Sequence, residues 1–257
     1  MKDLFAVKGK IVLVTGGGSG IGKMIAQGFV DHGAKVYIAS RNADRLNATA
    51  KALSEAGECI AVQADLSSMT GIEKLAADID RREGKLDVLI NNAGAAAIAG
   101  VEDFTEEMWD DVMDMNAKAV FFTIQKMLPL LRASASKECT SRVVNIVSTA
   151  GMRAPPFEAF SYSASKAAAV MITQHLAKVL AGQHILVNAI APGPFATEMM
   201  ADRIAQAGDA IRDRNPLKRL GTPEDIAGCA LFLASRASAW TTGSVLTCEG
   251  GSISIGS

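Results

Sequence analysis

The chain has 257 residues, of which 49% are hydrophobic and 21% are charged, proportions typical of soluble globular proteins. This composition argues against a disordered chain, a collagen-like repeat and a coiled coil. Lys and Arg number 26 and Asp and Glu number 27, so the net charge is −1 and nothing favours nucleic acid or an anionic membrane as a partner.

Seven short apolar segments rich in Val and Ile alternate with segments of helical spacing along the chain. The apolar segments span residues 11–14, 35–39, 59–63, 86–90, 142–147, 185–190 and 244–247. Helical spacing marks residues 21–32, 43–56, 72–83, 106–131, 163–180 and 224–234. Apolar strands separated by crossover helices indicate a parallel sheet covered on both faces. The sequence therefore predicts an α/β fold with a doubly wound, Rossmann-type sheet of about seven parallel strands.

The alternation continues without a linker, a charge block or a low-complexity tract. We therefore expect residues 1–257 to form a single dinucleotide-binding and catalytic domain. The extra length lies in residues 192–222, which are polar and contain Met. We expect this stretch to be a mobile lid or a substrate-binding insertion.

A glycine-rich turn, Thr15-Gly-Gly-Gly-Ser-Gly-Ile-Gly22, joins the first predicted strand to the first predicted helix. Glycines at this position let the backbone N–H groups and the positive end of the helix dipole approach a pyrophosphate. The spacing Gly16-x3-Gly20-x-Gly22 differs from the strict GxGxxG pattern, and such a turn can also serve folding alone. The strand-turn-helix context favours a dinucleotide site.

The second predicted strand ends in Ser40 and Arg41, with no acidic residue beside them. A protein selective for NAD normally places Asp or Glu here to bind the ribose hydroxyls. A hydroxyl followed by a guanidinium suits the 2′-phosphate of NADP instead, because Arg makes charge-assisted hydrogen bonds to phosphate. Arg41 can also be a solvated residue of the first helical turn, so NADP(H) is preferred and NAD(H) stays an alternative.

Tyr162 and Lys166 stand four residues apart at the start of a predicted helix, which places them on one face. The unperturbed pKa of a phenol is about 10, and a neighbouring ammonium lowers it, so the pair makes a workable proton donor. Ser148 ends the preceding predicted strand, at the edge where open α/β sheets bind ligands. Each residue alone fits a structural role, whereas together they predict a site on one carbonyl group.

These motifs together resemble the short-chain dehydrogenase/reductase family over nearly the whole chain. The matching set also includes Asp65-Leu66, Asn91-Asn-Ala-Gly94, Asn116 and Pro192-Gly193-x3-Thr197. Within the family, residues 128–136 are similar to the β-ketoacyl reductases associated with rhamnolipid synthesis.

The resemblance implies a role for each matching residue. Tyr162 exchanges the proton of the reacting oxygen, Ser148 orients that oxygen, and Lys166 holds the nicotinamide ribose and lowers the pKa of Tyr162. Asn116 anchors a water in the proton relay. The implied cofactor-binding residues are Gly16, Ser19, Gly20, Ile21, Gly22, Ser40, Arg41, Asp65, Leu66, Asn92, Gly94, Tyr162, Lys166, Ile190 and Thr197.

We therefore expect an NADP(H)-dependent oxidoreductase that interconverts a ketone and a secondary alcohol, with a 3-oxoacyl thioester as the first substrate to test. One alternative is an NAD(H)-linked alcohol, hydroxysteroid or sugar dehydrogenase, and another is a non-catalytic dinucleotide sensor. The three histidines fall outside every motif, so we expect no metal. Family analogy implies a homotetramer. The cysteines lack CxxC spacing, and the chain shows no signal peptide or membrane-spanning run, so we expect a cytoplasmic protein.

Overall fold

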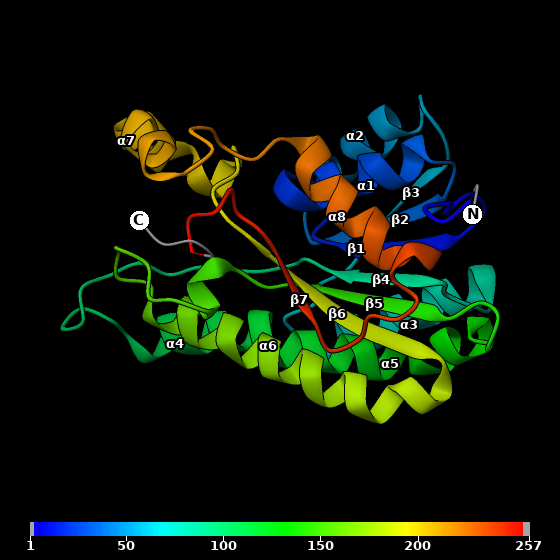
Figure 1. Ribbon diagram of the computed structural model, residues 1–257. Helices are drawn as coiled ribbons and strands as arrows, with labels where there is room; N and C mark the ends of the chain where they lie inside the picture. The colour runs from blue at the N-terminus through cyan, green and yellow to red at the C-terminus, as the bar shows by residue number, and fades with distance from the viewer. Residues whose placement is uncertain (1–2, 254–257) are drawn as a thin grey trace.

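The computed structural model describes residues 3–253. Within them, seven parallel strands form one sheet in the order β3-β2-β1-β4-β5-β6-β7 (Figure 1). The strands are β1 (Ile11–Thr15), β2 (Lys35–Ser40), β3 (Cys59–Gln63), β4 (Val88–Asn91), β5 (Ser141–Ile146), β6 (Ile185–Pro192) and β7 (Val245–Cys248). The predicted doubly wound parallel sheet is confirmed. Its strand order reverses between β1 and β4, the place where such sheets open a ligand crevice at their carboxyl ends.

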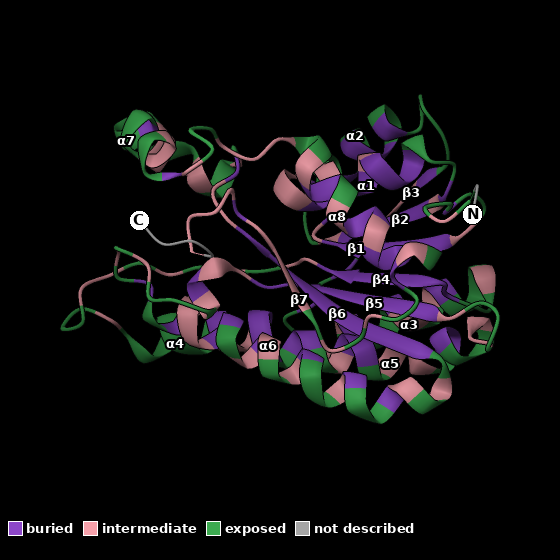
Figure 2. Cartoon of the chain, viewed as in Figure 1, coloured by how far each residue is buried: buried purple, intermediate pink, exposed green. Residues whose placement is uncertain are grey.

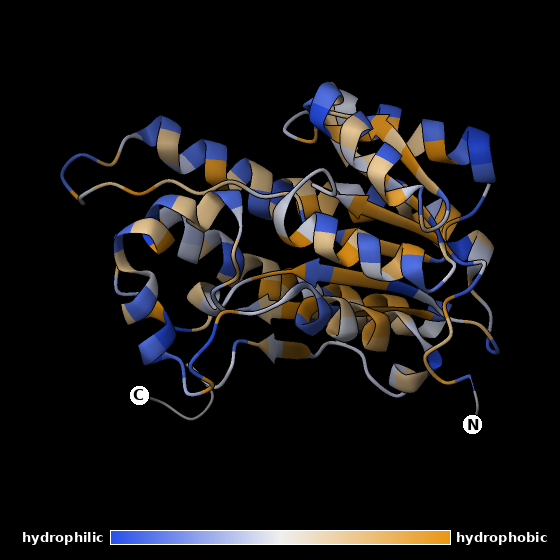
Figure 3. Ribbon diagram, turned by 90° about the horizontal axis from the view of Figure 1, so that it is seen from above, coloured by the Kyte–Doolittle hydropathy of each residue, from blue (hydrophilic) through white to orange (hydrophobic). Residues whose placement is uncertain are grey.

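Helices cover both faces of the sheet. One face carries α1 (Gly20–Asp31), α2 (Ala43–Leu53) and α8 (Pro223–Ala234). The other carries α3 (Met69–Glu83), α5 (Ala119–Ser134) and α6 (Phe160–Leu180). The strands between these layers are largely buried (Figure 2) and rich in hydrophobic residues (Figure 3).

The sheet serves two hydrophobic cores because successive side chains of a strand point to opposite faces. In β1, Val12 and Val14 join the core under α1, α2 and α8, whereas Ile11 and Leu13 join the core under α3 and α5. This two-sided burial explains why the strands are apolar throughout rather than alternating.

The predicted helix over residues 106–131 is wrong in one respect, because the structure divides it. It consists of α4 (Glu106–Met113), a π-helical turn (Asp114–Lys118) and α5. The wider turn contains Asn116, whose Oδ1 accepts from the Ala95 N–H and whose Nδ2 donates to the Ala95 carbonyl, both over 2.8 Å. A π turn inserts one residue without changing which residues are apolar, so spacing alone does not reveal it.

Residues 192–222 contain a helix that the sequence analysis did not predict, α7 (Ala201–Arg214), preceded by a 3-10 turn (Glu198–Met200). Both ends of the segment are anchored to the body of the fold. Phe195 is buried and pairs with Gly221, where a Cβ atom would stand 2.3 Å from its ring. Asn215 is buried and its side-chain amide donates to the Glu249 carbonyl over 2.8 Å.

Candidate active site

A cavity of about 990 Å³ opens at the carboxyl ends of the strands. Its wall is built by the loops that follow β1, β2, β4 and β5 and by the segment that contains α7. Most of the residues predicted from the sequence lie on this wall. They are Gly16, Ser19, Gly20, Ile21, Ser40, Arg41, Leu66, Asn92, Gly94, Ser148, Tyr162, Lys166 and Thr197.

The glycine-rich turn is packed so closely that a side chain is excluded at Gly16, Gly17 and Gly22. Gly16 and Gly20 adopt φ angles of +66° and +52°, which L side chains rarely adopt. A Cβ atom on Gly22 would stand 2.3 Å from the Gly16 carbonyl oxygen and 2.4 Å from Asn92 Nδ2. The N-cap Ser19 makes no side-chain cap bond, and the first turn of α1 holds no acidic residue. The N–H groups of that turn are therefore available to a phosphate.

Arg41 and Ser40 form the wall at the end of β2. Asp65 lies close enough to Arg41 for the two charges to interact. Hydrogen bonds from the hydroxyl and the backbone N–H of Ser67 lower the pKa of Asp65, and the positive charge of Arg41 acts in the same direction. Asp65 is therefore ionised at neutral pH and offsets part of the positive potential of Arg41.

Arg45, which the sequence analysis missed, supplies a second guanidinium at the same end of the cavity. It stands in the first turn of α2, and Asn42 caps that helix by accepting from the Arg45 N–H over 2.9 Å. Its Nη1 lies 2.6 Å from Glu198 Oε2, so this ion pair joins α2 to the segment before α7. The signal in the sequence was its position four residues after Arg41, within one helical turn of the predicted phosphate site.

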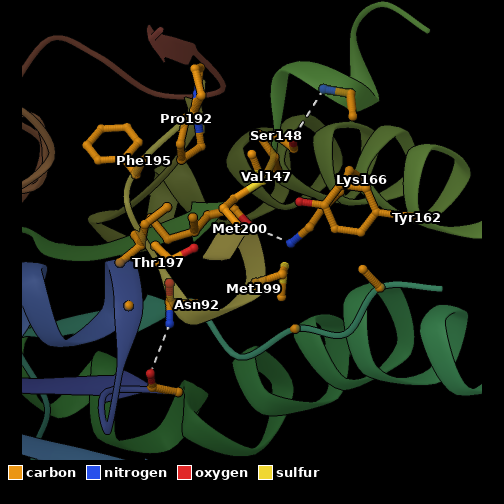
Figure 4. A pocket seen from close by; sticks show the side chains of 18 of the residues that line it. Asn92, Val147, Ser148, Tyr162, Lys166, Pro192, Phe195, Thr197, Met199 and Met200 are labelled. Atoms are coloured by element: carbon orange, nitrogen blue, oxygen red, sulfur yellow. Dashed lines mark hydrogen bonds between the residues drawn. The ribbon is translucent and has the colours of Figure 1, made fainter. Parts of the chain in front are cut away.

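Tyr162, Ser148 and Lys166 meet at the other end of the cavity. The Tyr162 hydroxyl is directed toward Ser148 (Figure 4). Tyr162 belongs to the first turn of α6, which begins at Phe160, three residues before the predicted start. Lys166 Nζ donates to the Ile146 carbonyl over 2.9 Å and lies 5.7 Å from the centroid of the Tyr162 ring.

Burial has the largest effect on the pKa values of Tyr162 and Lys166. It raises the pKa of Tyr162, and a hydrogen bond with Ser148 acts in the opposite direction. Burial also lowers the pKa of Lys166 to about 8. The expected lowering of the Tyr162 pKa is therefore not found here, because Tyr162 is desolvated and the Lys166 amine is bonded to a backbone carbonyl rather than to the phenol.

Four predicted residues lie off the cavity wall. Gly22 is buried against the glycine-rich turn, and Asp65 is exposed. Asn116 stands behind the wall on the backbone of Ala95. Ile190 is fully buried in β6, where its side chain belongs to the core.

The rest of the cavity wall, beside Tyr162 and Ser148, is formed by the loop after β5 and by the segment that contains α7. Arg203 of α7 stands over the ring of Phe157, with 3.6 Å from its guanidinium carbon to the ring centroid. This contact joins the loop after β5 to α7. Met199, Met200 and Phe195 come from the start of the same segment (Figure 4). Arg214 and Ile211 line the wall and were not predicted, since the helix that carries them was not.

Residues 3–253 hold no group of three or more His, Cys, Asp or Glu side chains that could bind a metal ion. None of the described helices is both long enough and apolar enough to cross a membrane. The four cysteines are free thiols.

Comparison with known proteins finds relatives over nearly the full chain. Residues 16–252 match a family model described as enoyl-(acyl carrier protein) reductase. The chain is 45% identical to the rhamnolipids biosynthesis 3-oxoacyl-(acyl-carrier-protein) reductase of Pseudomonas aeruginosa, over 98% of this chain and 99% of that protein. It is 34% identical to the short-chain dehydrogenase/reductase PhomF of Diaporthe leptostromiformis, over 98% and 94%. The Pseudomonas aeruginosa RhlG/NADP active-site complex is similar in structure, with a TM-score of 0.95, 45% identity and coverage of 98% and 99%.

Proposed function

Because the chain belongs to the short-chain dehydrogenase/reductase family, we propose that it interconverts a ketone and a secondary alcohol with NADP(H). The observation that carries this proposal is the Tyr162 hydroxyl facing Ser148 beside the buried Lys166, in a cavity that extends to the glycine-rich turn. A 3-oxoacyl thioester is the preferred substrate class, because the relative that is 45% identical over 99% of its length carries that activity in its name.

The cavity fits a dinucleotide phosphate at two places. The first turn of α1 offers backbone N–H groups to the pyrophosphate. Arg41 and Arg45 offer guanidinium groups to a 2′-phosphate. When bound, the nicotinamide supplies the hydride, so the protein has to orient the carbonyl group and manage one proton.

The proton is handled by the chain's own side chains. Tyr162 and Ser148 donate hydrogen bonds to the substrate carbonyl oxygen, and the proton of Tyr162 passes to that oxygen as the alcohol forms. The raised pKa of Tyr162 keeps the phenol protonated before the step. Lys166 binds the nicotinamide ribose in this proposal.

Asn116 has limited capacity for the expected relay water. Its amide hydrogens go to the Ala95 carbonyl and to Ser165 Oγ over 2.8 and 3.0 Å, and its carbonyl oxygen accepts from the Ala95 N–H. One lone pair of Oδ1 remains for a water. We propose that Asn116 acts through that lone pair while its other bonds fix the loop beside Gly94.

We also propose the finer organisation as one catalytic domain that assembles into a homotetramer in the cytoplasm. Apolar side chains exposed on α4, α5 and α6 support an assembly through these helices, since such groups gain from burial. They include Trp109, Phe121, Met171 and Val179. Light scattering of the purified protein tests this assembly, and a monomeric mass would contradict it.

The test follows nicotinamide absorbance with NADPH and NADH over 3-oxoacyl thioesters, steroid ketones, diketones and sugars, with a 2-enoyl thioester included. Tyr162→Phe removes the proton donor, and we expect kcat to fall about 10²- to 10⁴-fold with NADPH binding retained. The matched control is Tyr37→Phe, since Tyr37 is buried in β2 and bonds to Glu83.

Each alternative has its own outcome in this assay. Unchanged turnover in Tyr162→Phe refutes the role of Tyr162. A preference for NADH supports the NAD(H)-linked dehydrogenase. Tight dinucleotide binding without turnover on the panel contradicts the proposed reaction and supports the sensor.

A further inference from the structure

A line of buried polar side chains crosses from β4 through β5 to α6. Asn91 and Asn145 face each other in the register of β4 and β5, and the Asn91 amide donates to the Asn145 side-chain carbonyl over 2.9 Å. The Asn145 amide donates to Thr173 Oγ1 over 2.9 Å, and the Thr173 hydroxyl donates to the Ala169 carbonyl over 2.8 Å. The three side chains that form this line, Asn91, Asn145 and Thr173, are at most 3% exposed.

Each member of the line stands close in sequence to a group of the active site. In β4 it ends one residue before Asn92, whose amide donates to the Gly16 carbonyl over 3.2 Å. In β5 the carbonyl that follows it, that of Ile146, accepts from Lys166 Nζ. On α6, Thr173 stands seven residues after Lys166, two turns along the same helix face. The line therefore joins three elements that lead into the active site. These are β4, which leads to Asn92 of the cofactor loop, β5, which leads to Ser148, and α6, which carries Tyr162.

The apolar contact between α6 and the sheet is made by few side chains at the level of the active site. The cluster at this level consists of small residues, Val147, Ala169, Ala189 and Ala191. The helix also approaches the chain closely at Gly151, where a Cβ atom would stand 2.6 Å from the backbone carbon of Lys166. Small side chains make few interlocking contacts, so the axial position of the helix depends on the close approach at Gly151 and on directional hydrogen bonds, those of Thr173 and Lys166 among them.

We propose that Asn145 and Thr173 are positioning residues of the reaction, whose hydrogen bond sets the axial position of α6 and thereby the place of Tyr162 relative to Ser148. This inference rests on the proposed function. Neither residue lines the cavity, so neither contacts the reactants. A misplacement of about 1 Å at a reacting group can lower a rate by about 10².

The test compares Thr173→Val with Thr173→Ser. Valine keeps the volume and removes the hydroxyl that accepts from Asn145, whereas serine keeps the hydroxyl. We expect Thr173→Val to lower kcat about tenfold or more, counted per NADPH-binding site, with KM for the ketone unchanged within about twofold. We expect Thr173→Ser to restore kcat. Leu180→Ala is the control, because it creates a cavity at the other end of α6 and leaves the hydrogen bonds intact.

Every result of this comparison supports or refutes the positioning role of Asn145 and Thr173. Equal kcat in Thr173→Val and the wild type, an equal loss in Leu180→Ala, or failure of Thr173→Ser to recover refutes the positioning role. If Thr173→Val does not fold, Thr173→Ala leaves space for a water to pair the Asn145 amide and takes its place with the same expected loss. Failure of the proposed function is distinct, since the wild type would then show no Tyr162-dependent reduction.

Discussion

We predict that selectivity for NADPH depends on Arg41 more than on Arg45, and Arg41→Ala tests the contribution of Arg41. Arg41 is exposed and its charge acts on the Asp65 carboxylate, so its guanidinium can turn to a 2′-phosphate. Arg45 is already paired with Glu198, and their side chains are 47% and 68% exposed. An exposed ion pair of this kind contributes about 0–1 kcal/mol. Arg45 therefore leaves Glu198 at little cost in free energy, but an equally exposed contact with a phosphate adds little to NADPH binding.

The expected change in Kd for NADPH follows from the hydrogen bonds that Arg41 can make to the 2′-phosphate. A hydrogen bond to a charged group contributes about 1.5–3 kcal/mol, and the negative charge of Asp65 places Arg41 toward the lower half of that range. A loss of about 2 kcal/mol raises Kd for NADPH about 30-fold. NADH lacks the phosphate, so we expect its Kd to change less than about twofold.

The assay is a fluorescence titration of NADPH and NADH at two salt concentrations, because screening weakens an exposed charge contact. Lys51→Ala, on the last turn of α2, controls for a general loss of positive charge. Equal weakening of NADPH and NADH by Arg41→Ala, or tighter binding of NADH by the wild type, refutes this reasoning.

Two further predictions concern packing and pH. Gly22→Ala places a methyl group 2.3 Å from the Gly16 carbonyl oxygen, so we expect the melting temperature to fall and the dinucleotide affinity to drop about tenfold. The control is Gly182→Ala, which should change neither, because no heavy atom lies within 4 Å of the added methyl group. Burial tends to raise the pKa of Glu83, but hydrogen bonds from Lys35 and Tyr37 outweigh it, so the pKa is lowered from 4.5. The stability that Glu83 contributes is therefore present above that value and lost as pH falls through the lowered pKa. Urea unfolding should show Glu83→Gln about 1–2 kcal/mol less stable at pH 7, with the difference shrinking as the pH falls below 4.5. A difference that stays constant over this range contradicts the linkage.

The sequence predicted the parts of the structure in which the local environment permits only one kind of residue. Strands buried on both faces must be apolar, and the glycines of the first turn are the residues that its close packing tolerates. The π turn around Asn116 was missed because it arises from bonds to a distant backbone, that of Ala95. The direction of the Tyr162 pKa shift was missed because it depends on burial, which spacing does not give. α7 was missed because most of its residues are exposed and only Gly208 among them is buried, so its apolar residues are few.

This difference divides the active site into two parts of unequal predictability. The dinucleotide end is formed largely by backbone groups, whose positions follow from glycines and from the end of α1. The substrate end is formed by side chains of the loop after β5 and of the segment with α7, held together by Arg203 over Phe157. Side chains in such segments can change without disturbing the sheet, so the fold constrains the cofactor more tightly than the ketone. The substrate must therefore be found from the contacts of Phe157, Met199 and Arg203 rather than from the motifs that identify the family.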